Sequence, residues 1–481
     1  MTAATKSLPL HGLKRRALSL GAAKAFDYAM QFLLPVVLVR CLDKATFGEY
    51  RLLWLAISTL MYLATFNMPQ SLYLFLPRSD ARTKRLYLNQ TFVFLAASGL
   101  ACAWLVSPWN PWLPSAIAPL GNYGPLVPAF VALWLVAYMV DLVPTIDERI
   151  AWQSVASIGL SILRVMLLAA GAFFTGSMEV LLWLLLAFVV FKIGVLAYYV
   201  GRFHGIEPIL DGALFRRQVA IATPLGFSNA LYGLRWQGDQ WIAAYFFSLT
   251  SFAAFSVAAV LGPLVNVFRA SVNEAFLPSM SRLQAAGDAR GMAELNSRAN
   301  VMVGTLLYPM LAFCFLFAHE IVTVVYTSAY LEAVGPMRLY TLAFAAMVVE
   351  VGSIILLLEE GRFALRVNML AIAVSLLGSL AGALHIGLTG AAAGSVAAIY
   401  LDRMLTLRRI SRRTGIPVRR LQDWRGLGAA LVYGAVAALA AWLVVQAYAE
   451  EAPALVRLVI GGAVLSASYG LALVFLKKRR A

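Results

Sequence analysis

Residues 179–217 read EVLLWLLLAFVVFKIGVLAYYVGRFHGIEPILDGALFRR, and the fold depends on the pattern in this stretch. An apolar run fills residues 179–200, and a polar connection with three arginines follows at 201–217. A helix of about 20 apolar residues crosses the ~30 Å hydrocarbon core of a bilayer. The stretch therefore predicts one transmembrane helix that ends on a basic membrane face.

The same alternation repeats along the chain. Each apolar run has roughly 18–25 residues, apart from a longer seventh run, and this length suits a spanning helix. The fourteen runs lie at 17–39, 47–66, 86–106, 125–143, 152–175, 179–200, 218–247, 250–272, 299–318, 337–358, 363–384, 386–404, 427–447 and 453–476. With 61% hydrophobic and 13% charged residues, the composition is typical of a membrane protein. We predict an all-α, polytopic membrane protein of 14 transmembrane helices.

The 39 lysines and arginines are distributed unequally between the connections. When residues near the ends of the runs are counted with the adjoining connection, the N-terminal segment, the even-numbered connections and the C-terminal tail hold 29 of them, the odd-numbered connections hold 4, and 6 lie deeper inside apolar runs. Basic residues concentrate on the cytoplasmic side of membrane proteins, so we predict that both termini are cytoplasmic. Topology and anionic lipid then explain the net charge of +16, and nucleic-acid binding is not expected.

Other classes of function have little support in the sequence. Cys41, Cys102 and Cys314 are an odd number of cysteines in separate parts of the chain, which predicts no disulfide framework. No spacing typical of metal ligands occurs, and no connection reaches the roughly 50 residues of an independent domain. We therefore expect no enzyme activity, catalytic residue, metal or cofactor, and place all chemistry within or between helices.

A weak internal duplication divides the chain. When residues 39–50 are aligned with residues 244–255, Phe47 matches Phe252 and Tyr50 matches Phe255. Six helices per copy return the chain to the same side, so the two copies share one orientation and a site is expected between them near the midplane. The predicted parts are an N-terminal half at 1–205, a C-terminal half at 206–412, and a basic linker with two appended helices at 413–481.

Two short motifs resemble those of a known family. They are Arg40-x-Leu42-x4-Phe47-Gly48-x-Tyr50 and Leu277-Pro278-Ser279-Met280-Ser281-Arg282-Leu283. Together with the plan of six, six and two helices, they resemble the polysaccharide-transporter branch of the multidrug/oligosaccharidyl-lipid/polysaccharide exporter superfamily. The resemblance implies a flippase in the bacterial cytoplasmic (inner) membrane. Its implied substrate is an undecaprenyl-pyrophosphate-linked oligosaccharide for O-antigen, capsule or exopolysaccharide assembly, and membrane lipids and a polysaccharide polymerase are its implied partners.

Ionisable residues inside the apolar runs mark the candidate site. A charge near the bilayer centre costs ~2.5–3.5 kcal/mol, so it should face protein or water. Helical spacing places these residues on polar stripes along the first two helices of each half. The stripes are Lys24, Asp27 and Gln31; Arg51, Trp54, Ser58 and Tyr62; Ser228, Tyr232, Arg235 and Asp239; and Asn266, Arg269 and Asn273. We predict that they form the wall of a central aqueous cavity.

The resemblance also implies roles for these residues. The substrate-binding set would be Lys24, Arg51, Arg235 and Arg269 for the pyrophosphate, with Gln31 and Tyr232 for the sugars. Asp27 and Asp239 would balance the cations or carry a coupling ion, H⁺ or Na⁺, while the membrane potential alone is an open alternative.

A structural explanation competes for each charge. Lys24 with Asp27, and Arg235 with Asp239, have the spacing of ion pairs along one helix. Long basic side chains near helix ends can also extend to the membrane surface. For Arg164 and Lys192, we favour a structural role.

Three other functions are alternatives to an oligosaccharide flippase. A peptidoglycan lipid-precursor flippase is also built from fourteen helices. A cation-coupled drug antiporter of the same superfamily usually has twelve helices and an acid-dominated cavity. A polysaccharide polymerase or ligase generally has a large outer loop, whereas the outer connections here have fewer than about 20 residues.

Overall fold

The computed structural model describes residues 10–205, 210–259 and 261–480, and every regular element in these residues is a helix. The predicted all-α class is therefore confirmed. The α-helices are α1 (Leu10–Cys41), α2 (Lys44–Ala64), α3 (Met68–Phe75), α4 (Ala81–Leu105), α5 (Leu126–Ala137), α6 (Val143–Ile146), α7 (Ile150–Thr175), α8 (Met178–Phe203), α9 (Gly212–Phe246), α10 (Leu249–Ala258), α11 (Gly262–Ala285), α12 (Ala289–Leu316), α13 (Ala318–Tyr326), α14 (Val334–Met347), α15 (Gly352–Leu357), α16 (Gly361–Ile386), α17 (Leu388–Thr414), α18 (Val418–Leu421), α19 (Trp424–Tyr448) and α20 (Ala454–Arg480). Short 3-10 helices are η1 (Leu76–Arg78), η2 (Ser115–Tyr123), η3 (Tyr138–Asp141) and η4 (Ser328–Ala333).

Each predicted apolar run falls on one helix or on a helix broken into pieces. In the described part of the chain, eight helices are long and apolar enough to cross a membrane. The number rises to nine if α2 and α3, bent by 49°, form one span. The remaining runs lie on short helices or on helices with several charges, such as α9. The polytopic membrane class is confirmed, and the count of fourteen stays a prediction.

The helices form two compact units, Met1–Gly233 and Leu234–Ala481, and the boundary lies inside α9. The first part of α9 packs on the first unit, where a Cβ atom at Gly226 would lie only 2.7 Å from the Phe66 Cα. The half boundary that we predicted after residue 205 lies at a connection between two helices. The sequence reveals such connections, but it does not reveal which helices pack together. The predicted domain bounds remain a prediction.

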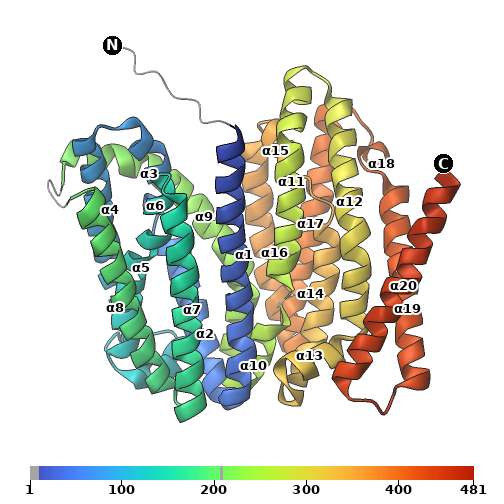
Figure 1. Ribbon diagram of the computed structural model, residues 1–481, viewed down its shortest axis with the longest axis horizontal. Coiled ribbons are helices and arrows are strands. Elements are labelled where there is room, and N and C mark those ends of the chain that lie inside the picture. Colours follow the sequence, from blue (N-terminus) through green and yellow to red (C-terminus); the bar gives the residue numbers. More distant parts are fainter. Residues whose placement is uncertain (1–9, 206–209, 260, 481) are drawn as a thin grey trace. The chain divides into compact units, whose positions relative to one another are not determined.

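In the first unit, α1 packs along α7, while α5 packs against both α4 and α8 (Figure 1). α2 and α3 are separated by a break at Thr65–Asn67, and Asn67 has a left-handed backbone with φ 61°. Asn229 on α9 donates to the Asn67 side-chain oxygen at 2.8 Å. The break is thus covered by the N-terminal part of α9, which supplies a partner for its polar groups.

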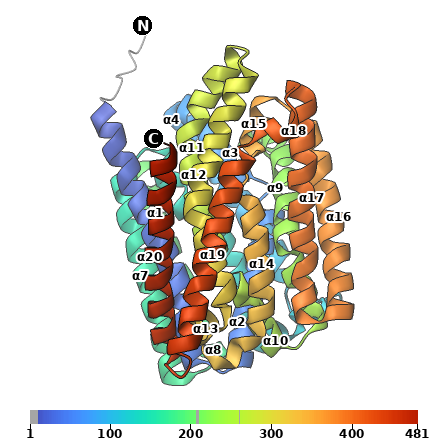
Figure 2. The same cartoon turned by 90° about the vertical axis from the view of Figure 1, so that its right-hand side faces the viewer.

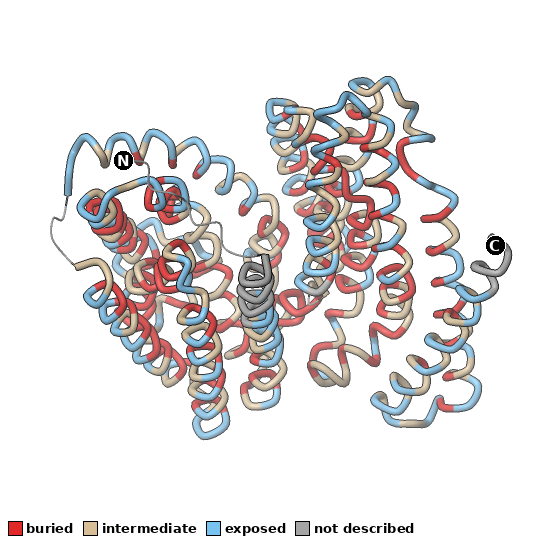
Figure 3. Tube along the Cα trace, turned by 45° about the horizontal axis from the view of Figure 1, so that its top comes forward, coloured by how far each residue is buried: buried red, intermediate tan, exposed pale blue. Residues whose placement is uncertain are grey.

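In the second unit, α16 and α17 run side by side and α14 packs against α17 (Figure 2). The contact between α16 and α17 is close because glycines face one another, and a Cβ at Gly378 would lie 2.9 Å from the Gly394 Cα. Small residues of this kind let membrane helices approach closely. α19 packs along α12, and α20 covers α19 and α13 around the buried Phe317 and Val445. Most described residues of α20 are exposed or intermediate (Figure 3).

The duplicated motifs have one structural cause in both units. Asp43 precedes α2 and accepts hydrogen bonds from the N–H groups of Ala45 and Thr46. Ser248 precedes α10 and accepts from the Ser251 N–H. A side chain in this position satisfies free amides at a helix start. The aromatic residues that follow, Phe47, Tyr50, Phe252 and Phe255, are at most 3% exposed.

Candidate functional site

A polar cluster forms where the helix after η4 is interrupted. α14 ends at Met347 and α15 begins at Gly352, which leaves backbone groups between them without helical partners. Asn300 on α12 supplies partners: its side-chain oxygen accepts from the Glu350 N–H at 3.1 Å, and its side-chain nitrogen donates to the Glu350 carbonyl at 2.9 Å. The break thereby holds Glu350 in the interior, with its side chain only 10% exposed.

Three arginines and a second acid lie around Glu350. Arg269 on α11 places its Nη1 atom 4.0 Å from Glu350 Oε1. On α9, Arg235 places its Nη2 atom 3.5 Å from Asp402 Oδ2 on α17. The neighbouring Arg403 interacts electrostatically with both acids and with both other arginines. We call these five residues the arginine cluster: Arg235, Arg269, Glu350, Asp402 and Arg403.

The arginine cluster contains one more cation than anion. Its side chains are between 10% and 23% exposed. Within the described residues, the Nε atoms of Arg269 and Arg403 and the Oε2 atom of Glu350 are buried without a hydrogen-bond partner. Guanidinium groups bind phosphate oxygens through paired N–H donors. The cluster therefore has both spare donors and excess positive charge for an anion.

Amide side chains border the arginine cluster. Arg235 donates from Nη1 to Asn368 Oδ1 on α16 at 2.6 Å, and Arg269 donates from Nη2 to Asn266 Oδ1 at 3.3 Å. Asn273 on α11 exchanges hydrogen bonds with Ser353 on α15 at 2.7 and 2.9 Å. Such groups can donate to and accept from hydroxyl groups as well as from each other. The surroundings therefore suit a ligand that carries both phosphate and hydroxyl groups.

Asp239 occupies a separate buried position on α9. Its Oδ2 atom accepts from the Tyr340 hydroxyl at 2.7 Å, its Oδ1 atom accepts from the Gln240 N–H at 2.8 Å, and Ser395 donates to it as well. In the described residues, Arg235 and Asp239 form no ion pair, so they do not neutralise each other along α9. Asp239 is thus a carboxyl group with neutral hydrogen-bond partners and only 3% exposure.

The first unit has its own ion pair at a matching helix break. α5 ends at Ala137 and α6 begins at Val143, with Asp141 at the end of η3 between them. Lys192 on α8 donates from Nζ to Asp141 Oδ2 at 2.7 Å and lies 5.0 Å from the Trp134 ring centre. The structural role favoured for Lys192 fits this pairing.

Two tryptophans extend this arrangement toward α7. The Trp54 and Trp134 rings are 5.1 Å apart, and the Arg164 guanidinium carbon lies 6.0 Å from the Trp54 ring centre. In the described residues, Arg164 Nε and Trp54 Nε1 are buried without a hydrogen-bond partner. Cations over tryptophan faces are attracted by the ring quadrupole, so these rings help hold the two cations.

The structure places the other predicted residues of the first unit as follows. Asp27 accepts from Gln31 at 2.7 Å and from Ser161 on α7, so Asp27 and Gln31 do lie together. Lys24 belongs to α1, but its side chain lies outside the described residues. Arg51 is half-buried on α2. Tyr232 is 50% exposed, with its ring 6.3 Å from that of Tyr62.

Two of the four predicted cations, Arg235 and Arg269, meet in the arginine cluster, together with residues not assigned to the site from sequence. Arg403 counts as the first member of a basic run when the sequence is read alone, yet α17 continues to Thr414 and keeps Arg403 within the helix bundle. A usable signal is the adjacent Asp402, since an acid beside a base in an apolar run indicates a buried polar site. That stripes from both halves line one cavity stays a prediction.

A second titratable group lies just beyond the first unit's helix break. Asp147 follows α6 and accepts from the Tyr199 hydroxyl at 2.7 Å and from His204 Nε2 at 2.6 Å. Burial alone would raise the pKa of Asp147, but these hydrogen bonds outweigh burial and hold the pKa below its ordinary value. Among the described residues, no group of three or more His, Cys, Asp or Glu side chains could hold a metal ion.

Comparisons with known proteins agree with this architecture. A family model described as "Polysaccharide biosynthesis protein" matches residues 37–335. No curated protein sequence matches the chain. Among solved structures, the lipid II flippase MurJ in an inward closed conformation has a TM-score of 0.67 at 13% identity, covering 95% of this chain and 99% of that one.

Two multidrug transporter structures are also similar. An inward-facing multidrug resistance MATE family transporter of the MOP superfamily has a TM-score of 0.62 at 13% identity, covering 81% of this chain and 96% of that one. The MATE multidrug transporter DinF-BH has a TM-score of 0.58 at 13% identity, covering 86% of this chain and 98% of that one. At this level of identity, these likenesses show a shared fold.

Proposed function

Because the chain belongs to the polysaccharide biosynthesis protein family, we propose that it is a flippase for undecaprenyl-pyrophosphate-linked oligosaccharide repeat units. It would act by alternating access in the bacterial cytoplasmic membrane, with both termini cytoplasmic, and supply surface polysaccharide assembly. The observation that carries the proposal is the arginine cluster, a buried site with an excess cation inside the second unit.

The chemistry of the arginine cluster suits a pyrophosphate. This group must leave water to cross a membrane, and its negative charges then need fixed cations and N–H donors. Arg235, Arg269 and Arg403 supply them, while Glu350 and Asp402 keep the empty site close to neutral. Asn266 and Asn368, which already bind the arginines, would exchange these contacts for phosphate or sugar oxygens.

The charges of the substrate and of the buried acids bear on the direction of transport and on its coupling to an ion gradient. A negative cytoplasm favours outward movement of an anion by ~2.3 kcal/mol per charge for each 100 mV. Asp239 would add a proton-coupled step, because a buried carboxyl held by hydroxyl groups can exist with or without its proton as the surrounding charge changes. Asp27 would have the equivalent role in the first unit.

A peptidoglycan lipid-precursor flippase is the second candidate. The observation that favours it is the TM-score of 0.67 to the lipid II flippase, with nearly complete coverage of both chains. Both candidate substrates contain a polyprenyl pyrophosphate, so the arginine cluster would serve either one. The two candidate substrates differ in their sugars. A drug antiporter fits less well, because a site with excess positive charge repels cationic drugs.

Flipping in proteoliposomes tests the proposal. The purified protein would be offered a fluorescent undecaprenyl-pyrophosphate oligosaccharide in one arm and a fluorescent peptidoglycan lipid precursor in the other. We expect faster movement of the oligosaccharide, and at least a tenfold loss of rate in Arg235→Ala. Arg338→Ala is the matched control, because Arg338 is exposed and binds the Phe315 carbonyl. Movement of the precursor alone would assign the second candidate function, and movement of neither would overturn the flippase proposal.

A further inference from the structure

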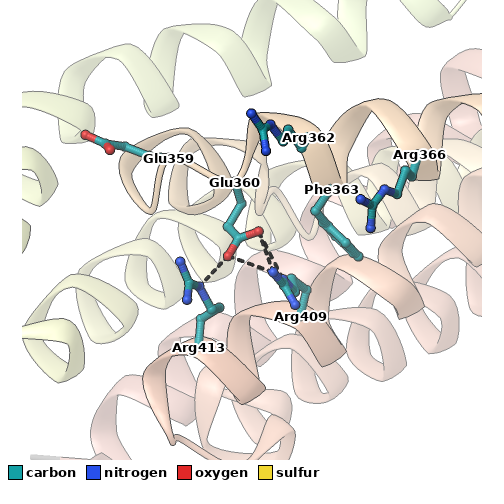
Figure 4. A pocket seen from close by; sticks show the side chains of 7 residues that line it. All are labelled: Glu359, Glu360, Arg362, Phe363, Arg366, Arg409 and Arg413. Carbon is teal, nitrogen blue, oxygen red and sulfur yellow. Dashed lines mark hydrogen bonds and ion pairs between the residues drawn. The ribbon is translucent and has the colours of Figure 1, made fainter.

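A second basic site lies outside the arginine cluster, where α16 begins and α17 approaches its end. A pocket of about 340 Å³ is lined by Glu359, Glu360, Arg362, Phe363, Arg366, Arg409 and Arg413 (Figure 4). Four arginines and two glutamates give these lining residues a net charge of +2. All of them belong to the second unit, and none of them is a member of the arginine cluster.

Glu360 is already neutralised by arginines of α17. Arg409 donates from Nη2 to both carboxylate oxygens at 3.0 and 2.8 Å and from Nε at 3.1 Å, and Arg413 forms a further ion pair with Glu360 (Figure 4). The Arg409 hydrogen bonds hold the pKa of Glu360 below its ordinary value. Glu360 therefore stays charged and links α16 to α17, rather than titrating near neutral pH.

Two further arginines extend the basic surface along α16. Arg362 and Arg366 are four residues apart, so they share one face of the helix, and both are exposed. Within the described residues, neither takes part in an ion pair. Glu360 also leaves the first turn of α16 without a side-chain cap, since its carboxylate is turned to α17. Free amides at the start of a 26-residue helix add to the attraction for an anion.

The helix face below these arginines is apolar. Met369 and Leu377 follow Arg362 and Arg366 on the same face of α16 by helical spacing, and their side chains are 57% and 67% exposed. α16 is one of the eight helices long and apolar enough to span a membrane. A phosphate group in the pocket would thus sit at the head of an apolar stripe, which is the shape of a phospholipid and not of a free ion.

We propose that this pocket binds the phosphate headgroup of an anionic membrane phospholipid, with the acyl chains along the Met369–Leu377 face. Arg362 and Arg366 hold the phosphate, and the ion pair of Glu360 with Arg409 and Arg413 shapes the floor of the pocket. The site is separate from the substrate site, so a lipid here would bind whether or not the protein transports oligosaccharides.

Native mass spectrometry of the full-length protein in detergent tests the site. The probes are phosphatidylglycerol, phosphatidylcholine with the same acyl chains, and inorganic phosphate. We expect one tightly bound phosphatidylglycerol that neither phosphatidylcholine nor millimolar phosphate displaces. Arg362→Gln with Arg366→Gln should weaken its affinity roughly thirtyfold, since each basic residue near a membrane surface contributes about a factor of five.

The control is Arg408→Gln with Arg412→Gln. These two residues are also exposed and four apart, but they do not line the pocket. Phosphatidylglycerol retained equally by the Arg362 and Arg366 variant would overturn the proposal. An equal loss in the control would also overturn it, since that result assigns binding to general surface charge. Displacement by inorganic phosphate would replace the lipid with a free anion as the ligand.

Discussion

In each unit, acidic and basic side chains meet at a helix break, but the numbers of positive and negative charges are balanced in one unit and not in the other. In the first unit, one acid meets one base: Asp141 pairs with Lys192 at 2.7 Å, over Trp134. In the second unit, Glu350 occupies the break and pairs with Arg269, Asp402 pairs with Arg235, and Arg403 interacts with both acids. A balanced ion pair has little capacity to bind a further ion, whereas a cluster with excess positive charge can bind an anion. Both units thus have a helix break with an acidic side chain, but only the break in the second unit lies in a cluster with excess positive charge.

The largest expected effect separates Arg403 from Lys192. Arg403→Met should lower the export rate at least tenfold, because it removes a charge-assisted hydrogen bond to the substrate pyrophosphate. Such a bond contributes about 1.5–3 kcal/mol. Lys192→Met should change the rate less than about threefold. Flipping in proteoliposomes, with both variants at equal protein levels, measures the difference. Equal losses of rate in the two variants would contradict the prediction that only the charges of the second unit bind the substrate.

The second prediction concerns stability in the first unit. Lys192→Met should lower the free energy of unfolding by about 1–3 kcal/mol, because Asp141 loses its cation. The loss stays below that of a fully buried pair, since the Asp141 side chain is 42% exposed. Adding Asp141→Asn should recover at least half of the loss. Thermal unfolding in detergent provides the measurement, and a double variant as unstable as the single one would show that packing, not charge, stabilises this site.

The third prediction compares the two candidate coupling acids. Asp239→Asn should remove most of the dependence of flipping on an imposed pH gradient, while leaving substrate binding intact. Asp27→Asn should have the smaller effect, because Asp27 is half-buried whereas Asp239 is fully enclosed. Rates in proteoliposomes with and without the gradient measure both effects. A parent protein that ignores both pH and sodium gradients would leave the two acids as counter-ions only.

The smallest expected effect concerns Asp147, whose hydrogen bonds depress its pKa. A depressed carboxyl pKa stabilises the folded state above the unfolded value of about 4, and this contribution is lost as the pH falls through the folded pKa. Tyr199→Phe should therefore cost about 0.5–1.5 kcal/mol at pH 7 and less below pH 4. Unfolding measured from pH 3 to 7 tests this, and a cost that does not vary with pH would assign the Tyr199 effect to packing.

Much of the site could be recognised from intramembrane charge. Arg235 and Arg269 stand out because a charge in an apolar run needs a polar surrounding, and the structure brings both into one cluster. Their partners could not be named, since Asp402 and Arg403 lie far along the chain, at the end of an apolar run. The spacing of Arg235 and Asp239 also suggests a pair, yet each side chain finds a different partner on another helix.

The all-helical membrane class and the positions of the helices follow from the sequence, and the caps that begin α2 and α10 depend only on residues next to them in the chain. These features depend on the local length of apolar runs and on side chains within one turn. Tertiary packing is responsible for the helix breaks at Asp141 and Glu350, for the membership of α9 in both units, and for the choice of charges that meet. Those outcomes depend on contacts such as that of Asn300 with Glu350, which join residues remote in sequence. Hydrophobic periodicity carries no information about such contacts, because it reports which face of a helix is apolar and not which helix faces it.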